Sequence, residues 1–146
     1  MAVSTKIYGN LSMHLHRGLI DFEDHTLKAM LCNQAYTPNQ DAHQFKNSVN
    51  NEVVGSGYVA GGKAIAGIGL NYDGSSNTFK ISASNLLWPA ITVPNIRYIV
   101  VYDDSYSTEA TKPLILYVDL GVNYSPTAQN FYYNWPSGTL LLNTVP

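Results

Sequence analysis

Two nearly continuous apolar segments in the second half of the chain constrain the fold most. They are "IRYIVVYDD", residues 96–104, and "PLILYVDLG", residues 113–121. Segments that are apolar on both faces are typical of central strands that are covered from each side. Pro113 stands at the start of its segment, where a missing backbone N–H does least harm to a sheet. The two segments therefore predict central strands of a β domain.

Several other segments alternate with a period of two, as half-buried strands do. In "KAIAGIGLNYD", residues 63–73, the better-buried face is expected to carry Ala64, Ala66, Ile68, Leu70 and Tyr72. The loop "DGSSN" follows, and then "TFKISAS", residues 78–84, places Phe79, Ile81 and Ala83 on one face. Together these segments predict a β-hairpin whose loop is slightly longer than the tightest type.

Further strands are predicted at both ends of the chain. "LSMHLH", residues 11–16, alternates, "HTLKAMLC", residues 25–32, suits one more strand, and residues 129–143 suit two strands around a turn at residues 136–138. About eight strands with turn signals between them are typical of a sandwich, jelly roll or barrel. We expect an all-β, single-domain β-sandwich or jelly roll over residues 11–146, preceded at residues 1–10 by an arm that becomes ordered on contact with a neighbour.

One short helix is predicted near residues 38–48. Thr37 is a good N-cap, Pro38 suits the first helical position and Gln40 completes a capping box. This prediction bears on Asp41 and His43, which otherwise resemble an acid–base pair. Residues two apart on a helix point about 200° from each other, so we expect no shared proton between them.

Composition excludes several functions. The 146 residues carry a formal net charge of −2 and 12% charged residues, which provides no basic field for nucleic acid. The single cysteine, Cys32, ends an apolar segment and is expected to be buried and inert. With neither a signal peptide nor a membrane-spanning segment, we expect a soluble chain made in a reducing cytoplasm, with no membrane partner. The low charge fits either a neutral β surface or one covered by other subunits.

Few residues suggest chemistry. His14 and His16 form an H-x-H pair that on a strand would share a face and could begin a metal site with Asp21 or Glu23. An exposed histidine pair is the simpler interpretation, because no third histidine lies at a suitable place. Asp103 and Asp104 are expected in a solvated turn. We therefore predict no catalytic residue, no metal and no cofactor.

Aromatic residues are the remaining candidates for binding. In "FYYNWP", Phe131, Tyr133 and Trp135 would share one face of a strand, and Tyr132 the other. One face is expected to fill the core, and exposed rings could anchor a protein interface or stack on sugars. The candidate interface residues are Tyr106, Tyr132 and Trp135.

Five segments of the sequence resemble those of a known group of proteins. "LIDFEDHTLKAML", "AYTPNQDAHQF", "NEVVGSGYVAGGKAIAG", "RYIVVYDD" and "PLILYVDLG" resemble, in order and spacing, small virion structural proteins of tailed bacteriophages, over about residues 11–142. Some proteins of that group are capsid cement or decoration proteins, jelly rolls that sit on the outer shell and lock capsomers together. The resemblance transfers no catalytic residue.

Three functions are therefore expected, in order. The first is a capsid cement or decoration subunit of a virion, assembled in the host cytoplasm, with the major capsid protein and copies of itself as partners in a homo-oligomer. The second is a carbohydrate-binding module on a tail fibre or capsid surface, with Tyr106, Tyr132 and Trp135 stacking on sugars. The third is a small metal-dependent enzyme built on His14 and His16.

Overall fold

The computed structural model describes residues 2–144, so the first residue of the expected arm and residues 145–146 of the expected domain lie outside the described residues. Within residues 2–144, ten strands, one α-helix and three 3-10 turns follow one another. Their bounds are β1 Ser4–Ile7, α1 Leu11–His16, β2 Leu27–Asn33, η1 Lys46–Ser48, β3 Lys63–Ala64, β4 Gly69–Asp73, β5 Thr78–Ser82, β6 Leu86–Ile91, β7 Ile96–Asp103, η2 Glu109–Thr111, β8 Leu114–Tyr124, β9 Gln129–Tyr133, η3 Pro136–Gly138 and β10 Thr139–Thr144.

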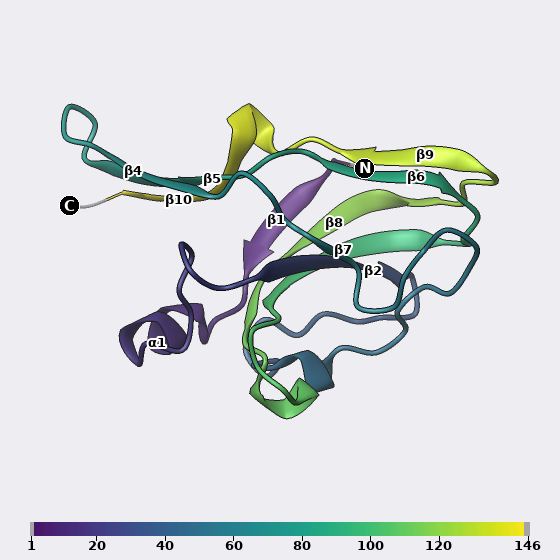
Figure 1. Ribbon diagram of the computed structural model, residues 1–146, viewed down its shortest axis with the longest axis horizontal. Coiled ribbons are helices and arrows are strands. Elements are labelled where there is room, and N and C mark those ends of the chain that lie inside the picture. The colour runs from purple at the N-terminus through teal and green to yellow at the C-terminus, as the bar shows by residue number, and fades with distance from the viewer. Residues whose placement is uncertain (1, 145–146) are drawn as a thin grey trace.

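The strands form two layers (Figure 1). One layer is a five-stranded sheet in the order β1-β8-β7-β2-β3, and the strand pairs in it are antiparallel. The other layer consists of a three-stranded sheet, β10-β5-β4, and a two-stranded sheet, β6-β9. Figure 1 shows the three-stranded sheet projecting beyond the five-stranded one, above α1. We call this projecting sheet the wing.

The two apolar segments form the central strands β7 and β8, as predicted. β7 pairs with β2 on one side and β8 on the other, and most residues of β7 and of the first half of β8 are buried. Leu31, Ile99 and Val118 pack toward the second layer, whereas Met30, Val100 and Tyr117 pack under the loops on the opposite face. Because both faces of these strands are covered, neither shows polar alternation.

The all-β, sandwich-like architecture with one short helix is confirmed, whereas jelly-roll connectivity stays a prediction. β4 and β5 form the predicted hairpin, with Ile81 and Ala83 buried. The expected buried face of residues 63–73 is wrong, because Ile65 reaches the core while Leu70 and Tyr72 remain exposed.

The helix lies elsewhere than predicted. Residues 38–48 form no α-helix, because the Asn39 side-chain oxygen accepts the backbone N–H groups of Asp41 and Ala42 in a turn. Phe45 then forms an antiparallel bridge with Pro113, which holds the segment extended. A side chain that takes local backbone donors competes with a helix in this way.

The helix is instead α1, at residues 11–16, where a strand was expected. Leu11 and His14, three residues apart, turn inward from it. Gly18, at φ +69°, ends it in a Schellman motif: the N–H of Leu19 donates to the carbonyl of His14 and that of Gly18 to Leu15. A glycine two residues past "LSMHLH" was the sequence signal for a helix end.

The segment expected as an arm is paired within the same chain. β1 forms an antiparallel pair with β8, from Ser4 opposite Asp119 to Ile7 opposite Leu116. All four β1 residues are nonetheless exposed, since β1 is an edge strand of the five-stranded sheet. β1 is therefore ordered by β8 of its own chain, whereas an arm was expected to become ordered on contact with a neighbour.

Candidate interaction surface

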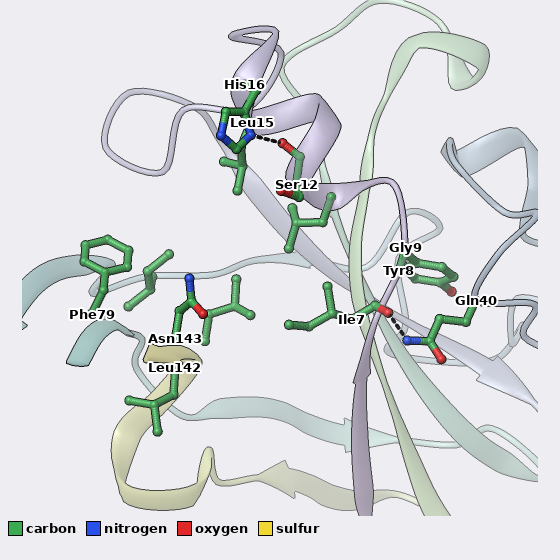
Figure 2. Close-up of a pocket in the computed structure, with 13 residues that line it drawn as sticks. Ile7, Tyr8, Gly9, Ser12, Leu15, His16, Gln40, Phe79, Leu142 and Asn143 are labelled. Atoms are coloured by element: carbon green, nitrogen blue, oxygen red, sulfur yellow. Dashed lines mark hydrogen bonds between the residues drawn. The ribbon is translucent and has the colours of Figure 1, made fainter. Parts of the chain in front are cut away.

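A groove of about 440 Å³ separates α1 from the wing. α1 contributes Leu15 and His16, the turn after β1 contributes Gly9, and the wing contributes Phe79 and Leu142 (Figure 2). None of the lining residues is Asp, Glu, Lys or Arg. We call this feature the α1 groove. A neutral groove with mostly apolar walls suits an apolar protein segment better than a charged ligand.

Backbone contacts hold the floor of the α1 groove. The Gln40 side-chain amide donates to the carbonyl of Ile7 at 2.7 Å, and the N–H of Gly9 donates to the carbonyl of Gln40 at 2.9 Å. A Cβ atom at position 9 would lie 3.3 Å from that carbonyl, so glycine allows the close approach. The strand-to-helix turn is thus fixed by the segment that was expected to be a helix.

The wing turns an apolar face toward the groove. Residues paired across a sheet share a face, and two such rows cross the wing: Leu70–Ile81–Leu141 and Tyr72–Phe79–Asn143. Phe79, Ile81 and Leu141 line the α1 groove, so this is the face that α1 covers. Leu70 is still 41% exposed and Tyr72 is 55% exposed. The apolar face therefore extends beyond what the chain itself covers.

The apolar surface continues past the groove. A shallower groove of about 420 Å³ between β1 and β10 is lined by Thr5, Ile7, Leu140 and Leu142, among others. Ile7 and Leu142 belong to both grooves, and Leu142 is 60% exposed. Contiguous exposed apolar surface of this kind marks interaction sites in folded proteins.

The three candidate interface residues do not converge. Trp135 is buried and donates its indole N–H to the carbonyl of Ser84 at 3.1 Å, so it cannot present its ring to a partner. Tyr106 follows β7, donates to the carbonyl of Leu19 at 2.6 Å and lies edge-on to His25. Tyr132, on β9, is exposed as its position in the alternation allows.

Tyr132 borders a smaller groove of about 310 Å³ with Tyr124, Asn130 and Asn134. The Asn130 amide donates to the Tyr132 hydroxyl at 3.0 Å, which fixes the ring beside an amide. A held tyrosine next to side-chain amides is a surface on which a sugar ring could stack. Of the three residues in the carbohydrate prediction, Tyr132 lines this groove, whereas Tyr106 and Trp135 do not.

The histidine candidates have different environments. On α1, His14 is buried against Phe45, with ring centroids 5.0 Å apart, whereas His16 is exposed and contacts the carbonyl of Ser12 through Nδ1. The expectation of a histidine pair on one face of a strand is therefore wrong. Among residues 2–144, no group of three or more His, Cys, Asp or Glu side chains is placed to hold a metal ion.

His43 belongs to a chain of buried hydroxyl groups and does not contact Asp41 through a hydrogen bond within the described residues. The Tyr36 hydroxyl contacts Nδ1 of His43 at 3.0 Å and the hydroxyl of Tyr8 at 2.8 Å. Burial raises the pKa of Tyr36 to about 12 and lowers that of His43. Both groups therefore remain neutral near pH 7. Cys32 is buried as expected, and burial raises the pKa of its thiol.

Asp103 and Asp104 are not in a solvated turn. Asp103 is fully buried, with its carboxylate 2.5 Å from Nδ1 of His25, whose side chain is 26% exposed. No serine, threonine or cysteine side chain within the described chain hydrogen-bonds to that imidazole. The pair thus joins the segment before β2 to the end of β7, in an arrangement that supplies a structural contact but no nucleophile. Because 78 residues separate the two positions, no sequence spacing indicated it.

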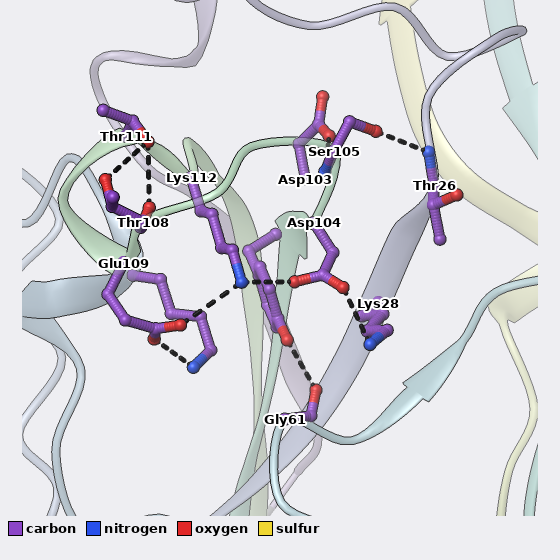
Figure 3. Close-up of polar contacts among 12 residues, drawn as sticks. Thr26, Lys28, Gly61, Asp103, Asp104, Ser105, Thr108, Glu109, Thr111 and Lys112 are labelled. Atoms are coloured by element: carbon purple, nitrogen blue, oxygen red, sulfur yellow. Dashed lines mark hydrogen bonds and ion pairs between the residues drawn. The ribbon is translucent and has the colours of Figure 1, made fainter.

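Asp104 organises a network of charges around η2 (Figure 3). Its carboxylate lies 2.7 Å from Nζ of Lys28 and 2.8 Å from Nζ of Lys112, and Lys112 and Lys46 also contact Glu109. Burial alone would raise the pKa of Asp104, but the two lysines lower it below its ordinary value. The three lysines of this network are therefore paired with two carboxylates, those of Asp104 and Glu109.

Comparisons of the chain with protein-family models, curated proteins and solved structures find no significant match. No helix among residues 2–144 is long and apolar enough to cross a membrane.

Proposed function

We propose that the chain is a virion structural protein of a tailed bacteriophage: a capsid cement or decoration subunit that stabilises the phage head through protein–protein contacts. The observation that carries the proposal is the apolar face of the wing, which α1 covers only in part. The resemblance of the sequence to small tailed-phage structural proteins supports the same function.

The α1 groove gives this function a physical mechanism. Its lining carries no Asp, Glu, Lys or Arg side chain, so a partner segment can enter without removing water from any of these charged groups, a step that is costly in protein interfaces. Burial of a Leu side chain such as Leu142 contributes about 1.5–3 kcal/mol. Repetition of a modest contact over a shell then multiplies its effect, because each bound subunit can hold two neighbours together.

The partners in this proposal are the major capsid protein and further copies of the chain, and the location is the virion. Mass spectrometry of purified particles is expected to find the chain in many copies per particle. Its absence from particles of the phage that encodes it would remove the proposal.

A binding assay tests the surface itself. Isolated chain is mixed with particles that lack it, and bound chain is measured after sedimentation. Leu142→Asp places a charge in both grooves and is expected to weaken binding by about 10-fold or more. Val54→Asp is the matched control, because Val54 is highly exposed but lines none of the three grooves. Equal binding by both variants would show that the α1 groove does not contact the capsid.

The groove around Tyr132 favours a second candidate function, a carbohydrate-binding module on a tail fibre or capsid surface. Tyr132→Ala is expected to abolish binding on a glycan array, whereas Tyr72→Ala, another exposed tyrosine, is expected to leave it intact. An array on which the unaltered chain binds nothing would count against this function.

A further inference from the structure

The outer edge of β4 is open. β4 ends the wing, whose strand order is β10-β5-β4, and its residues from Leu70 to Asp73 are all exposed. The last strand of a sheet presents backbone N–H and C=O groups that no neighbouring strand satisfies, and such a row is a template for another strand. Figure 1 shows β4 on the part of the sheet that projects from the body of the molecule.

β4 lacks most of the features that usually protect an edge. It contains neither lysine nor proline, and it pairs with β5 without a register shift. The other strands at the ends of sheets within residues 2–144 differ: β1 carries Lys6, β3 has two residues, β6 contains Pro89, β6 and β9 pair with a register shift, and β10 shifts register against β5. Irregularity, lysine and proline discourage strand addition. β4 has none of these and carries one charge, Asp73 at its end, so it is the edge best suited to accept a strand.

The sequence of β4 is complementary to itself. In an antiparallel pair of two β4 strands centred on Asn71, Leu70 of each copy lies opposite Tyr72 of the other, and both belong to the apolar face of the wing. Pairs of an aromatic and an aliphatic residue directly across two strands are favourable. Asp73, the charged residue of β4, lies opposite Gly69 of the second copy, so like charges do not meet.

We infer that two copies of the chain associate by antiparallel pairing of their β4 strands about Asn71, which joins two wings into one six-stranded sheet. The occupant of the free edge is therefore a second copy of this chain. The inference rests on the proposed function, because it names the contact through which copies of the subunit join. Joining the wings also brings Leu70 and Tyr72 of both copies together, which extends the apolar face beside each α1 groove.

A cross-linking experiment on the isolated chain tests the register. Residues directly opposite on antiparallel strands have Cα atoms about 4.5–5.5 Å apart, within the range of about 4.4–6.8 Å that a disulfide spans. Asn71→Cys is therefore expected to form a disulfide-linked species of twice the 16.0 kDa chain mass under mild oxidation. Asn71 is exposed and the native Cys32 is buried, so the new thiol is the reactive one.

Asp73→Cys is the matched control, because its two copies would lie about 14 Å apart along the strands. It is exposed on the same face as Asn71 and is expected to stay uncrosslinked. Equal cross-linking of the two variants, or none by Asn71→Cys, would overturn the inference. Light scattering of the unaltered chain is a second readout: a dimer is expected, and a monomer would also overturn it.

This experiment is separable from the test of the proposed function. If the chain binds particles but Asn71→Cys does not cross-link, the β4 contact is wrong and the decoration function stands. If Asn71→Cys cross-links but particles never contain the chain, the dimer stands and the decoration function fails.

Discussion

Removal of the imidazole of His25 is expected to destabilise the fold far more than an average surface mutation. The Asp103 carboxylate is fully buried and has two contacts, Nδ1 of His25 at 2.5 Å and the backbone N–H of Ser105 at 2.9 Å. Removing the hydrogen-bond partner of a buried polar group costs about 1–3 kcal/mol. Because His25 is partly exposed, water can enter the vacated space, so we expect a loss of about 2–3 kcal/mol for His25→Ala.

Urea denaturation followed by tryptophan fluorescence measures this loss, since Trp88 and Trp135 are both buried. With a denaturant slope of about 2 kcal/mol per molar, the midpoint is expected to fall by about 1 M. The melting temperature should fall by about 5–10 °C for a chain of this size.

Two further variants make the result specific. His16→Ala is the matched control, because His16 is exposed on α1, and its free energy of unfolding should stay within about 0.5 kcal/mol of the unaltered chain. His25→Asn restores an amide donor and is expected to recover part of the loss. If His25→Ala were as stable as His16→Ala, with the same denaturant slope, the buried contact would not hold the two segments together.

Three other predictions concern single residues. Burial, and then the charge of Arg17, lowers the pKa of His14 below its ordinary value of 6.5, so the unfolded chain binds more protons and the free energy of unfolding should decrease as the pH is lowered through 6.5; His14→Gln should show a weaker dependence in urea titrations at pH 7.5 and pH 5. Gly62→Ala should prevent folding as judged by circular dichroism, because Gly62 has a φ of +81° and a Cβ there would lie 2.0 Å from the carbonyl of Ala29. Gly18 has a φ of +69° with open space around it, so Gly18→Ala should lower the free energy of unfolding by only about 1 kcal/mol. The thiol of Cys32, whose pKa burial raises, should react with a thiol reagent only in denaturant, and rapid reaction in the native state would contradict its burial.

The elements set by two-sided burial could be predicted from sequence, because they need no information from elsewhere in the chain. β7 and β8 are apolar on both faces in the sequence and are covered on both faces in the structure. The alternation in residues 131–135 is also borne out, with Phe131, Tyr133 and Trp135 all buried. The pattern alone does not specify which face is inward, so it allows Trp135 either in the core or on a binding surface.

The helix predicted at residues 38–48 and the strand predicted at residues 11–16 are both wrong, because each segment carries sequence signals for two different structures. Residues 11–16 satisfy both a period of two and a helical turn, and the Schellman motif at Gly18 together with inward-facing Leu11 and His14 favours the helix. Thr37 and Pro38 are good helix starters, but the Asn39 side chain takes the backbone donors that a helix would need.

The candidate surface was less predictable than the fold. The α1 groove combines residues from α1, β1, β5 and β10, which are far apart in sequence and meet only when the wing is in place. The contact between His25 and Asp103 is equally non-local. The composition shows that the chain has few charged residues, but it does not show which part of the surface lacks them.

The pairing of β1 with β8 has a consequence for biosynthesis. Ser4 lies opposite Asp119, so β1 leaves a ribosome well before β8 and has no partner strand until most of the strands between them have followed it. Pairing between segments this distant in sequence is slow to form, and until then β8 offers an incomplete edge to neighbouring nascent chains. Production of the chain at high levels should therefore benefit from slow translation or low temperature, which give β1 time to close its own sheet.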